Sequence, residues 1–234
     1  MIGAAIRSRL KHAADDDRGV SLSELLVTMM VASILLAIAG SMFVTVAQTT
    51  TASNQTRDAA TVAGTVTNSI GRAIRSAVQL PKANQTALDS AVMAGSGPST
   101  VTVSTLVMPA SSTTLTPVKI RYSVVNGALI EETWTGTNAT GYWVFAGTAN
   151  RTKTLGSTIV LPTGTQASMF GYFDGAGNAI TVAATGLTDA QRATVASIKL
   201  TLRVRSEKSA TAKPIIIDTT IGMPNLGYSG DDDA

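Results

Sequence analysis

The stretch Arg18-Gly19-Val20-Ser21-Leu22-Ser23-Glu24-Leu25-Leu26 decides the fold of this chain, because it opens a predominantly apolar run that continues to Val46. The run is long enough for a membrane-spanning helix, which needs roughly 20 apolar residues. Its only acidic residue is Glu24, and a carboxylate at the centre of such a helix costs about 2.5–3.5 kcal/mol or more. The sequence therefore predicts a membrane helix with one functional carboxylate near its start.

The residues around Glu24 resemble the type IV prepilin signature. In that family a short charged leader ends in Gly, the mature chain starts with an apolar residue, and Glu is its fifth residue. Here Gly19 matches the end of the leader, Val20 the first mature residue and Glu24 the fifth. Val20 stands where Phe or Met is usual, and Ser23 stands where an apolar residue is common. The apolar frame matches at Leu22, Leu25 and Leu26.

The resemblance implies cleavage between Gly19 and Val20 by a membrane prepilin peptidase, with Val20 a candidate for N-methylation. It also implies that Glu24 directs assembly by pairing with a Val20 amine, and that Leu22 and Leu25 belong to the recognised segment. The partners that it implies are this peptidase, other pilin or pseudopilin subunits, and an inner-membrane assembly platform.

The charges of the leader set the expected orientation. Four basic and three acidic residues give segment 1–19 a net charge of +1, so the rest of the chain carries +2 of the total of +3. The positive-inside rule then keeps the leader cytoplasmic and places the C-terminal domain outside. We expect a single-pass protein of the inner (cytoplasmic) membrane that later enters a pilus or pseudopilus.

The apolar run also admits other interpretations. A secretory signal peptide has an apolar core of about 7–15 residues followed by a small-residue cleavage site, and the run here is longer. An uncleaved signal anchor that holds a surface adhesin or binding module stays open as the alternative, and an exported enzyme is the second rival.

Beyond the apolar run the pattern becomes amphipathic, with apolar residues every four positions from Val62 to Val78. Such a repeat gives a helix one apolar face, and Leu80-Pro81 is expected to end it because the residue before proline avoids the helical conformation. The predicted segments are a cleaved leader (1–19), a transmembrane half of the first helix (20–47), its amphipathic half (48–80), a connecting loop (81–98), an antiparallel β-rich globular domain (99–226) and an acidic tail (227–234).

Alternating apolar and polar residues predict the strands of the globular domain. Asn126-Gly127 predicts a tight hairpin turn, and Thr188 is the expected N-cap of a short helix. The expected strands are 101–107, 118–124, 128–134, 142–146, 157–161, 169–173, 179–182, 198–204 and 214–221, with a helix at 187–196. The fold class is therefore α+β, with a long N-terminal helix packed on an antiparallel β-sheet domain, as in pilins.

The C-terminal half carries a second, looser resemblance. Phe170-Gly-Tyr172-Phe173-Asp174 with its Gly-rich turn, and the 187–196 helix leading into the 198–204 strand, resemble J-type pseudopilins and PilW-type minor pilins. This resemblance, together with a chain longer than a usual major pilin, implies a minor subunit.

Composition argues against enzymatic chemistry. The chain has no Cys, and its one His is His12 in the predicted leader. Without mature His or Cys there is no Ser-His-Asp triad, no Cys-His pair and no His-ligated metal site. Glu131 and Glu132 are neighbours on a predicted strand, so their side chains point to opposite faces. We expect no catalytic residues and no cofactor.

Two acidic runs are weak calcium candidates, at Asp174 and at Asp231 and Asp232. Calcium takes six to eight oxygen ligands, which neither run supplies alone, so a hairpin turn and a solvated tail are the favoured interpretations. Arg203, Arg205 and Lys208 form a small basic cluster without interleaved aromatic residues, and we therefore expect no nucleic-acid binding.

Overall fold

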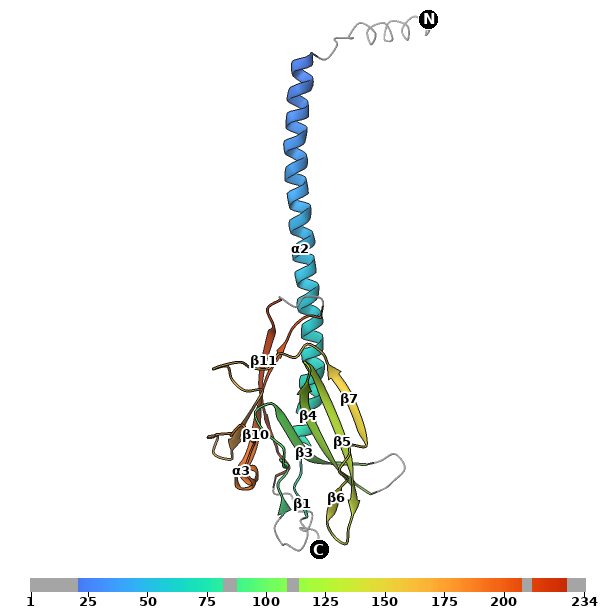
Figure 1. The fold of residues 1–234 in the computed structure, drawn as a ribbon, viewed down its shortest axis with the longest axis vertical. Coiled ribbons are helices and arrows are strands. Elements are labelled where there is room, and N and C mark those ends of the chain that lie inside the picture. Colours follow the sequence, from blue (N-terminus) through green and yellow to red (C-terminus); the bar gives the residue numbers. More distant parts are fainter. Residues whose placement is uncertain (1–20, 82–87, 109–113, 208–211, 227–234) are drawn as a thin grey trace, which may run out of the picture. The chain divides into compact units, whose positions relative to one another are not determined.

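The computed structural model describes residues 21–81, 88–108, 114–207 and 212–226. The predicted leader and the acidic tail lie outside these residues. The chain divides into two compact units, Met1–Ala52 and Ser53–Ala234. The first unit holds the beginning of the long helix, and the second holds the end of that helix and all the described strands (Figure 1).

Helix α2 (Leu22–Arg75) contributes residues to both units. It begins at Leu22, and no proline interrupts it. It ends at Arg75 rather than at Leu80-Pro81, because the chain turns to pair with the sheet first. Ala77 forms a β-bridge with Thr105, and the Val78 N–H donates to the Ser104 carbonyl at 2.9 Å. Sheet hydrogen bonds thus replace helical ones before the proline is reached.

The part of α2 in the second unit buries one face against the strands. The four-residue repeat in the sequence predicted this face, and the structure confirms it at Val66, Ile70 and Ile74, whose side chains are fully buried. Small residues complete the contact and allow the helix to approach the sheet closely. The buried residues of α2 are Ala59, Ala63, Val66, Ile70, Gly71, Ala73 and Ile74.

The second unit contains two larger antiparallel sheets and one short pair of strands. The first sheet has the order β3 (Thr100–Val107), β4 (Thr116–Val125), β5 (Ala128–Asn138) and β6 (Trp143–Phe145), and β7 (Arg151–Gly156) also pairs with β5. The second sheet has the order β11 (Ile215–Gly222), β10 (Val195–Val204), β8 (Phe170–Asp174) and β9 (Ala179–Ile180). The short pair is β1 (Leu80–Pro81) with β2 (Leu88–Asp89). The predicted α+β class, with a long N-terminal helix packing on antiparallel sheets, is confirmed.

The tight turn at Asn126-Gly127 joins β4 to β5 as predicted. Both residues have positive φ angles, 51° and 75°, which a two-residue hairpin of this type requires and which Asn and Gly adopt most readily. Val125 pairs with Ala128 across the turn. The turn therefore fixes the register of the longest hairpin in the domain.

The predicted strand at 157–161 is wrong. Thr158 has a φ of 63°, which breaks the extended conformation, and Ile159 makes only an isolated bridge to Val204. The strand instead lies just before, as β7. Its first four residues are exposed, so β7 lacks the apolar alternation that would have revealed it in the sequence.

Helix α3 (Asp189–Thr194) is shorter than the predicted 187–196 helix but has the predicted cap. The Thr188 side chain accepts from the Gln191 N–H at 3.3 Å, while Gln191 Oε1 accepts from the Thr188 N–H at 3.0 Å. This reciprocal pair is a capping box, which satisfies two backbone donors that a helix start leaves open. Val195 ends the helix because it already belongs to β10.

Candidate assembly site on the N-terminal helix

Glu24 lies in the first turn of α2, and Ser21 fixes where that turn begins. The Ser21 carbonyl accepts from the N–H groups of Glu24 and Leu25, each at 3.0 Å, and the Ser21 Oγ lies 3.2 Å from the Glu24 nitrogen. Ser followed three residues later by Glu is a typical sequence at a helix N-terminus. A negative charge there also interacts favourably with the helix dipole. The backbone of Glu24 is thus held in a defined helical position.

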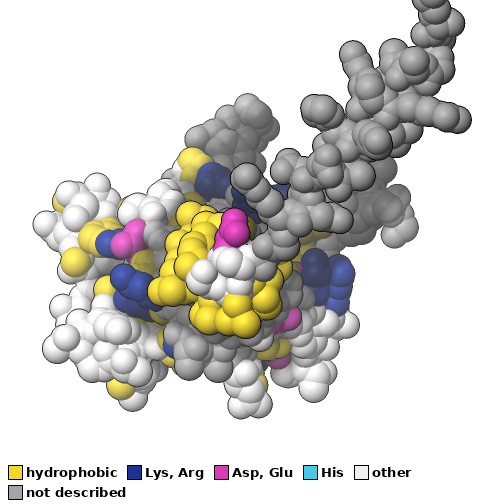
Figure 2. All heavy atoms as spheres, turned by 90° about the horizontal axis from the view of Figure 1, so that it is seen from above, with side chains coloured by type: hydrophobic (Ala, Val, Ile, Leu, Met, Phe, Trp, Pro, Cys, Tyr) yellow, Lys and Arg dark blue, Asp and Glu magenta, His cyan; other side chains and the backbone are white. Residues whose placement is uncertain are grey.

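The apolar side chains that follow Glu24 have no protein partner in the first unit. Every large hydrophobic side chain from Leu22 to Val46 is exposed, with Leu22 at 80% and Leu25 at 49%. In the view from above, hydrophobic side chains gather around the first turns of α2 (Figure 2). By length and composition, α2 is the one helix in the described part of the chain that is apolar and long enough to cross a membrane.

The hydroxyl groups of this segment are satisfied within the helix itself. Thr28, Ser33, Ser41 and Thr45 each donate to a carbonyl three or four residues earlier, at 2.7–2.9 Å. Such back-bonding hides the polar group of a Ser or Thr inside a helix. Glu24 therefore remains the only strongly polar side chain of the apolar segment without a partner inside it.

No cation of α2 can neutralise Glu24. The two ion pairs found among the described residues, Arg121–Glu132 and Arg192–Asp189, do not include it. The nearest basic residue of the helix is Arg57, about 50 Å along the axis at 1.5 Å per residue. A carboxylate in low dielectric is penalised heavily unless it is paired. The partner charge must therefore come from outside this helix.

Of the remaining predicted site residues, some lie outside the described part of the chain and others lie within it. Gly19, Val20, Asp231 and Asp232 lie outside the described residues. Asp174 is the last residue of β8, at the start of the turn to β9, and its carboxylate accepts from the N–H groups of Ala176 and Asn178 at 2.9 and 2.8 Å and from the Asn178 side chain at 3.1 Å. These bonds hold the pKa of the Asp174 carboxyl below its usual range, the Asn178 side chain contributing most. The Asp174 carboxylate thus stabilises its own hairpin turn.

A partly buried polar network under α2 was not predicted from the sequence. Tyr122 is almost fully buried, and its hydroxyl donates to Glu131 at 3.0 Å, while the Ser69 Oγ donates to the same carboxylate oxygen at 3.1 Å. Burial raises the pKa of Tyr122 well above its usual value. The network joins α2 to β4 and β5, and only the register of three distant segments brings these residues together.

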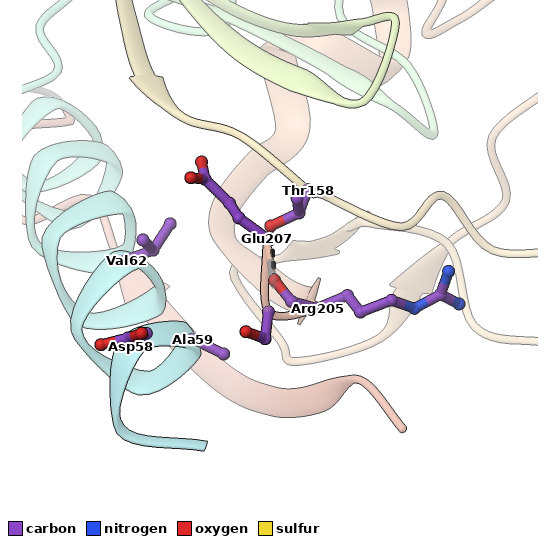
Figure 3. A pocket seen from close by; sticks show the side chains of 7 residues that line it. Asp58, Ala59, Val62, Thr158, Arg205 and Glu207 are labelled. Atoms are coloured by element: carbon purple, nitrogen blue, oxygen red, sulfur yellow. Dashed lines mark hydrogen bonds between the residues drawn. The ribbon is translucent and has the colours of Figure 1, made fainter. Parts of the chain in front are cut away.

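A small pocket of about 170 Å³ lies beside α2 in the second unit (Figure 3). Its charged residues are Asp58, Arg205 and Glu207, and the guanidinium of Arg205 extends away from Asp58 (Figure 3). The Thr158 hydroxyl donates to the Arg205 carbonyl, and the Ser157 hydroxyl donates to Glu207. The described part of the chain holds no cluster of three His, Cys, Asp or Glu suited to a metal ion.

Comparison with known protein families gives a match in the N-terminal segment. Residues 15–40 match the prokaryotic N-terminal methylation motif, which is the type IV prepilin-like signature and includes both Gly19 and Glu24. The motif, together with the long apolar helix, supports a type IV pilin-like or pseudopilin-like protein with a transmembrane helix. It implies processing by a prepilin peptidase and assembly with other pilins, and its structural character is consistent with a chain that is not an enzyme. No curated protein matches the chain.

Proposed function

We propose that this chain is a minor pilin or pseudopilin, a structural subunit that is cleaved after Gly19 and built into a type IV pilus or a type II secretion pseudopilus. The observation that supports it most is Glu24. This carboxylate stands in the first turn of an apolar helix, inside a methylation motif, and has no ion-pair partner among the described residues.

The proposed mechanism follows from electrostatics. Cleavage after Gly19 creates a positively charged amine on Val20, about one helical turn from Glu24. Within a filament the amine of one subunit can meet the carboxylate of its neighbour. Opposite charges attract strongly in low dielectric, and an unpaired charge there is penalised. Packing that pairs both groups therefore selects one register between neighbouring helices.

The proposed location agrees with this mechanism. The leader stays in the cytoplasm, the apolar half of α2 lies in the inner membrane, and the second unit lies outside until the subunit enters the filament. The minor-subunit assignment draws on the length of the chain and on the resemblance of its C-terminal half to minor subunits.

The first experiment determines the N-terminus of the protein in cells with and without a prepilin peptidase. We expect Val20 as the first residue when the peptidase is present, and an intact leader when it is absent. An intact leader in peptidase-containing cells would refute the proposal and favour an uncleaved signal anchor.

The second experiment tests assembly separately from cleavage. We expect Glu24→Ala and Glu24→Gln to be cleaved normally but lost from sheared filaments, because each leaves the Val20 amine unpaired. Ser23→Ala is the matched control, since it alters the preceding residue without removing a charge. Normal incorporation of the Glu24 variants would rule out the pairing role.

A further inference from the structure

A cleft of about 570 Å³ lies in the second unit between the last turns of α2 and the strands β3, β4 and β5. Its apolar part is poorly covered, since Leu106, Val107 and Met108 are 38%, 44% and 61% exposed. Three consecutive large hydrophobic residues at the end of a strand are an unusual exposure for a folded domain. The cleft therefore has room and apolar surface for another side chain.

The same cleft holds two cations, Arg72 and Lys153, and one carboxylate, Glu131, so its net charge is positive. Arg72 reaches it from α2 and Lys153 from β7, and no ion pair is found for either in the described part of the chain. The one carboxylate in the cleft, Glu131, is occupied by hydrogen bonds from Ser69 and Tyr122. The cleft thus suits a group that presents a carboxylate next to an apolar side chain.

One strand of the same chain presents this combination. Asp218 on β11 is the single carboxylate in the described residues of the second unit for which the structure shows no hydrogen bond or ion pair. Ile216 is 54% exposed and lies two residues earlier, so both side chains share one face of the strand. β11 is also an edge strand of its sheet, and edge strands are open to additional partners.

We propose that the cleft of one copy receives residues 216–218 of a second copy. The Asp218 carboxylate would lie between Arg72 and Lys153, and Ile216 would cover the exposed residues at 106–108. The apolar contact provides most of the affinity, because exposed ion pairs contribute little. The charges instead select the register of the contact.

The two surfaces are different, which determines what the contact builds. β11 and β7 lie on opposite sides of α2 (Figure 1), so the contact joins unlike faces of neighbouring copies. A contact between unlike faces repeats from copy to copy and yields a ring or a helical filament. The inference rests on the proposed function, and it adds that at least two copies of this chain are neighbours in the filament.

The absence of Cys from the sequence gives a clean background for disulfide cross-linking in membranes of cells that express the full-length chain. We expect Met108→Cys and Ile216→Cys chains to form a disulfide-linked dimer only when the two variants are expressed together. A chain with both substitutions should form a ladder of higher multimers.

Three results would overturn the contact. The first is a dimer of Met108→Cys alone or of Ile216→Cys alone, with no mixed dimer when both are expressed together, which indicates a symmetric interface. The second is a disulfide that joins Met108→Cys only to a Cys of another protein. The third is the absence of any cross-link.

A charge swap tests the register within the same assay. We expect Lys153→Asp to lower the yield of the 108–216 cross-link by about fivefold, and Asp218→Lys to do the same. Combining them restores the attraction and should restore the yield. Arg151→Asp is the matched control, because Arg151 is exposed on the same strand but does not line the cleft. A double variant no better than the singles would contradict the proposed pairing.

The N-terminus is determined on the same samples, so that the two proposals fail separately. Chains that begin at Val20 but do not cross-link would leave the proposed function intact and overturn the contact between copies. Chains that keep the leader would overturn the proposed function, and the cross-link would still decide whether the two surfaces meet.

Discussion

The two ends of α2 differ in what surrounds their apolar side chains. From Leu22 to Val46 every large hydrophobic side chain is exposed, whereas from Ala59 to Ile74 one face is buried in the domain. The first stretch is apolar on all sides, so one protein partner cannot cover it, and a surrounding apolar solvent such as lipid is required. The second stretch has a single apolar stripe, which its own domain covers.

The largest expected difference concerns matched isoleucines. Ile70 is fully buried and Ile38 is 49% exposed, so Ile70→Ala should destabilise the domain by about 2–5 kcal/mol, and Ile38→Ala should leave it unchanged. Both Trp residues of the chain, Trp134 and Trp143, lie in the domain, so their fluorescence during urea unfolding in detergent reports the difference. Equal losses of stability from Ile70→Ala and Ile38→Ala would contradict this difference between the two ends of α2.

Two glycines sharpen the comparison. A Cβ at Gly156 would lie 2.7 Å from Val62 Cγ1 and 3.2 Å from Val66 Cγ2, whereas a Cβ at Gly40 meets nothing within 4 Å. Gly156→Ala should therefore cost about 1–3 kcal/mol through overpacking, and Val62→Ala should recover part of this loss. Gly40→Ala should leave the stability of the domain unchanged. Urea midpoints are measured for Gly156→Ala, for Gly156→Ala combined with Val62→Ala, and for Gly40→Ala. An unchanged midpoint for Gly156→Ala would mean that α2 does not press on β7.

Alkaline pH should weaken only the domain half. Burial raises the folded-state pKa of Tyr122 and of Tyr172, while an unfolded tyrosine titrates near pH ~10. The stabilisation is therefore complete below about pH 10 and falls above it, by about 1.4 kcal/mol per pH unit for each tyrosine that stays protonated in the fold. Tyr122→Phe should flatten this dependence, measured as the urea midpoint against pH. An unchanged slope would show that Tyr122 ionises without opening the fold.

The helix caps give the smallest expected effect. Thr188→Ala removes the capping box of α3 and should cost about 1 kcal/mol, whereas Thr188→Ser should cost much less. Ser21→Ala removes the corresponding cap of α2, and we expect it to loosen the first turn without changing the unfolding of the domain. Circular dichroism and urea unfolding separate the two effects. A domain destabilised by Ser21→Ala would show that the two regions unfold together.

Local patterns predicted the elements whose signal lies in neighbouring residues. The start of α2, the stripe through Val66 and Ile70, and the Asn126-Gly127 turn follow from composition, period and turn chemistry alone. The misplaced strand at 157–161 and the early end of α2 have another cause. Both depend on pairing with distant segments, since Ile159 bridges to Val204 and Ala77 bridges to Thr105, and no local pattern encodes such contacts.

The candidate sites divide in the same way. Glu24 was predictable because its position relative to Gly19 is a linear motif. The cleft was not, because Arg72, Lys153 and the residues at 106–108 come from three separate parts of the sequence. Asp218 likewise looks ordinary in the sequence, and it stands out only when the other described carboxylates of the second unit are seen to have partners.

The hydroxyl groups along the first half of α2 have a mechanical consequence. Thr28, Ser33, Ser41 and Thr45 bond to their own helix, so they offer neighbouring helices no hydrogen bonds that would have to break during sliding. Two such helices can therefore rotate or shift along each other without breaking hydrogen bonds from these hydroxyl groups. Under the proposed pairing, Glu24 is then the one group of this stretch that sets the position of a subunit along its neighbour.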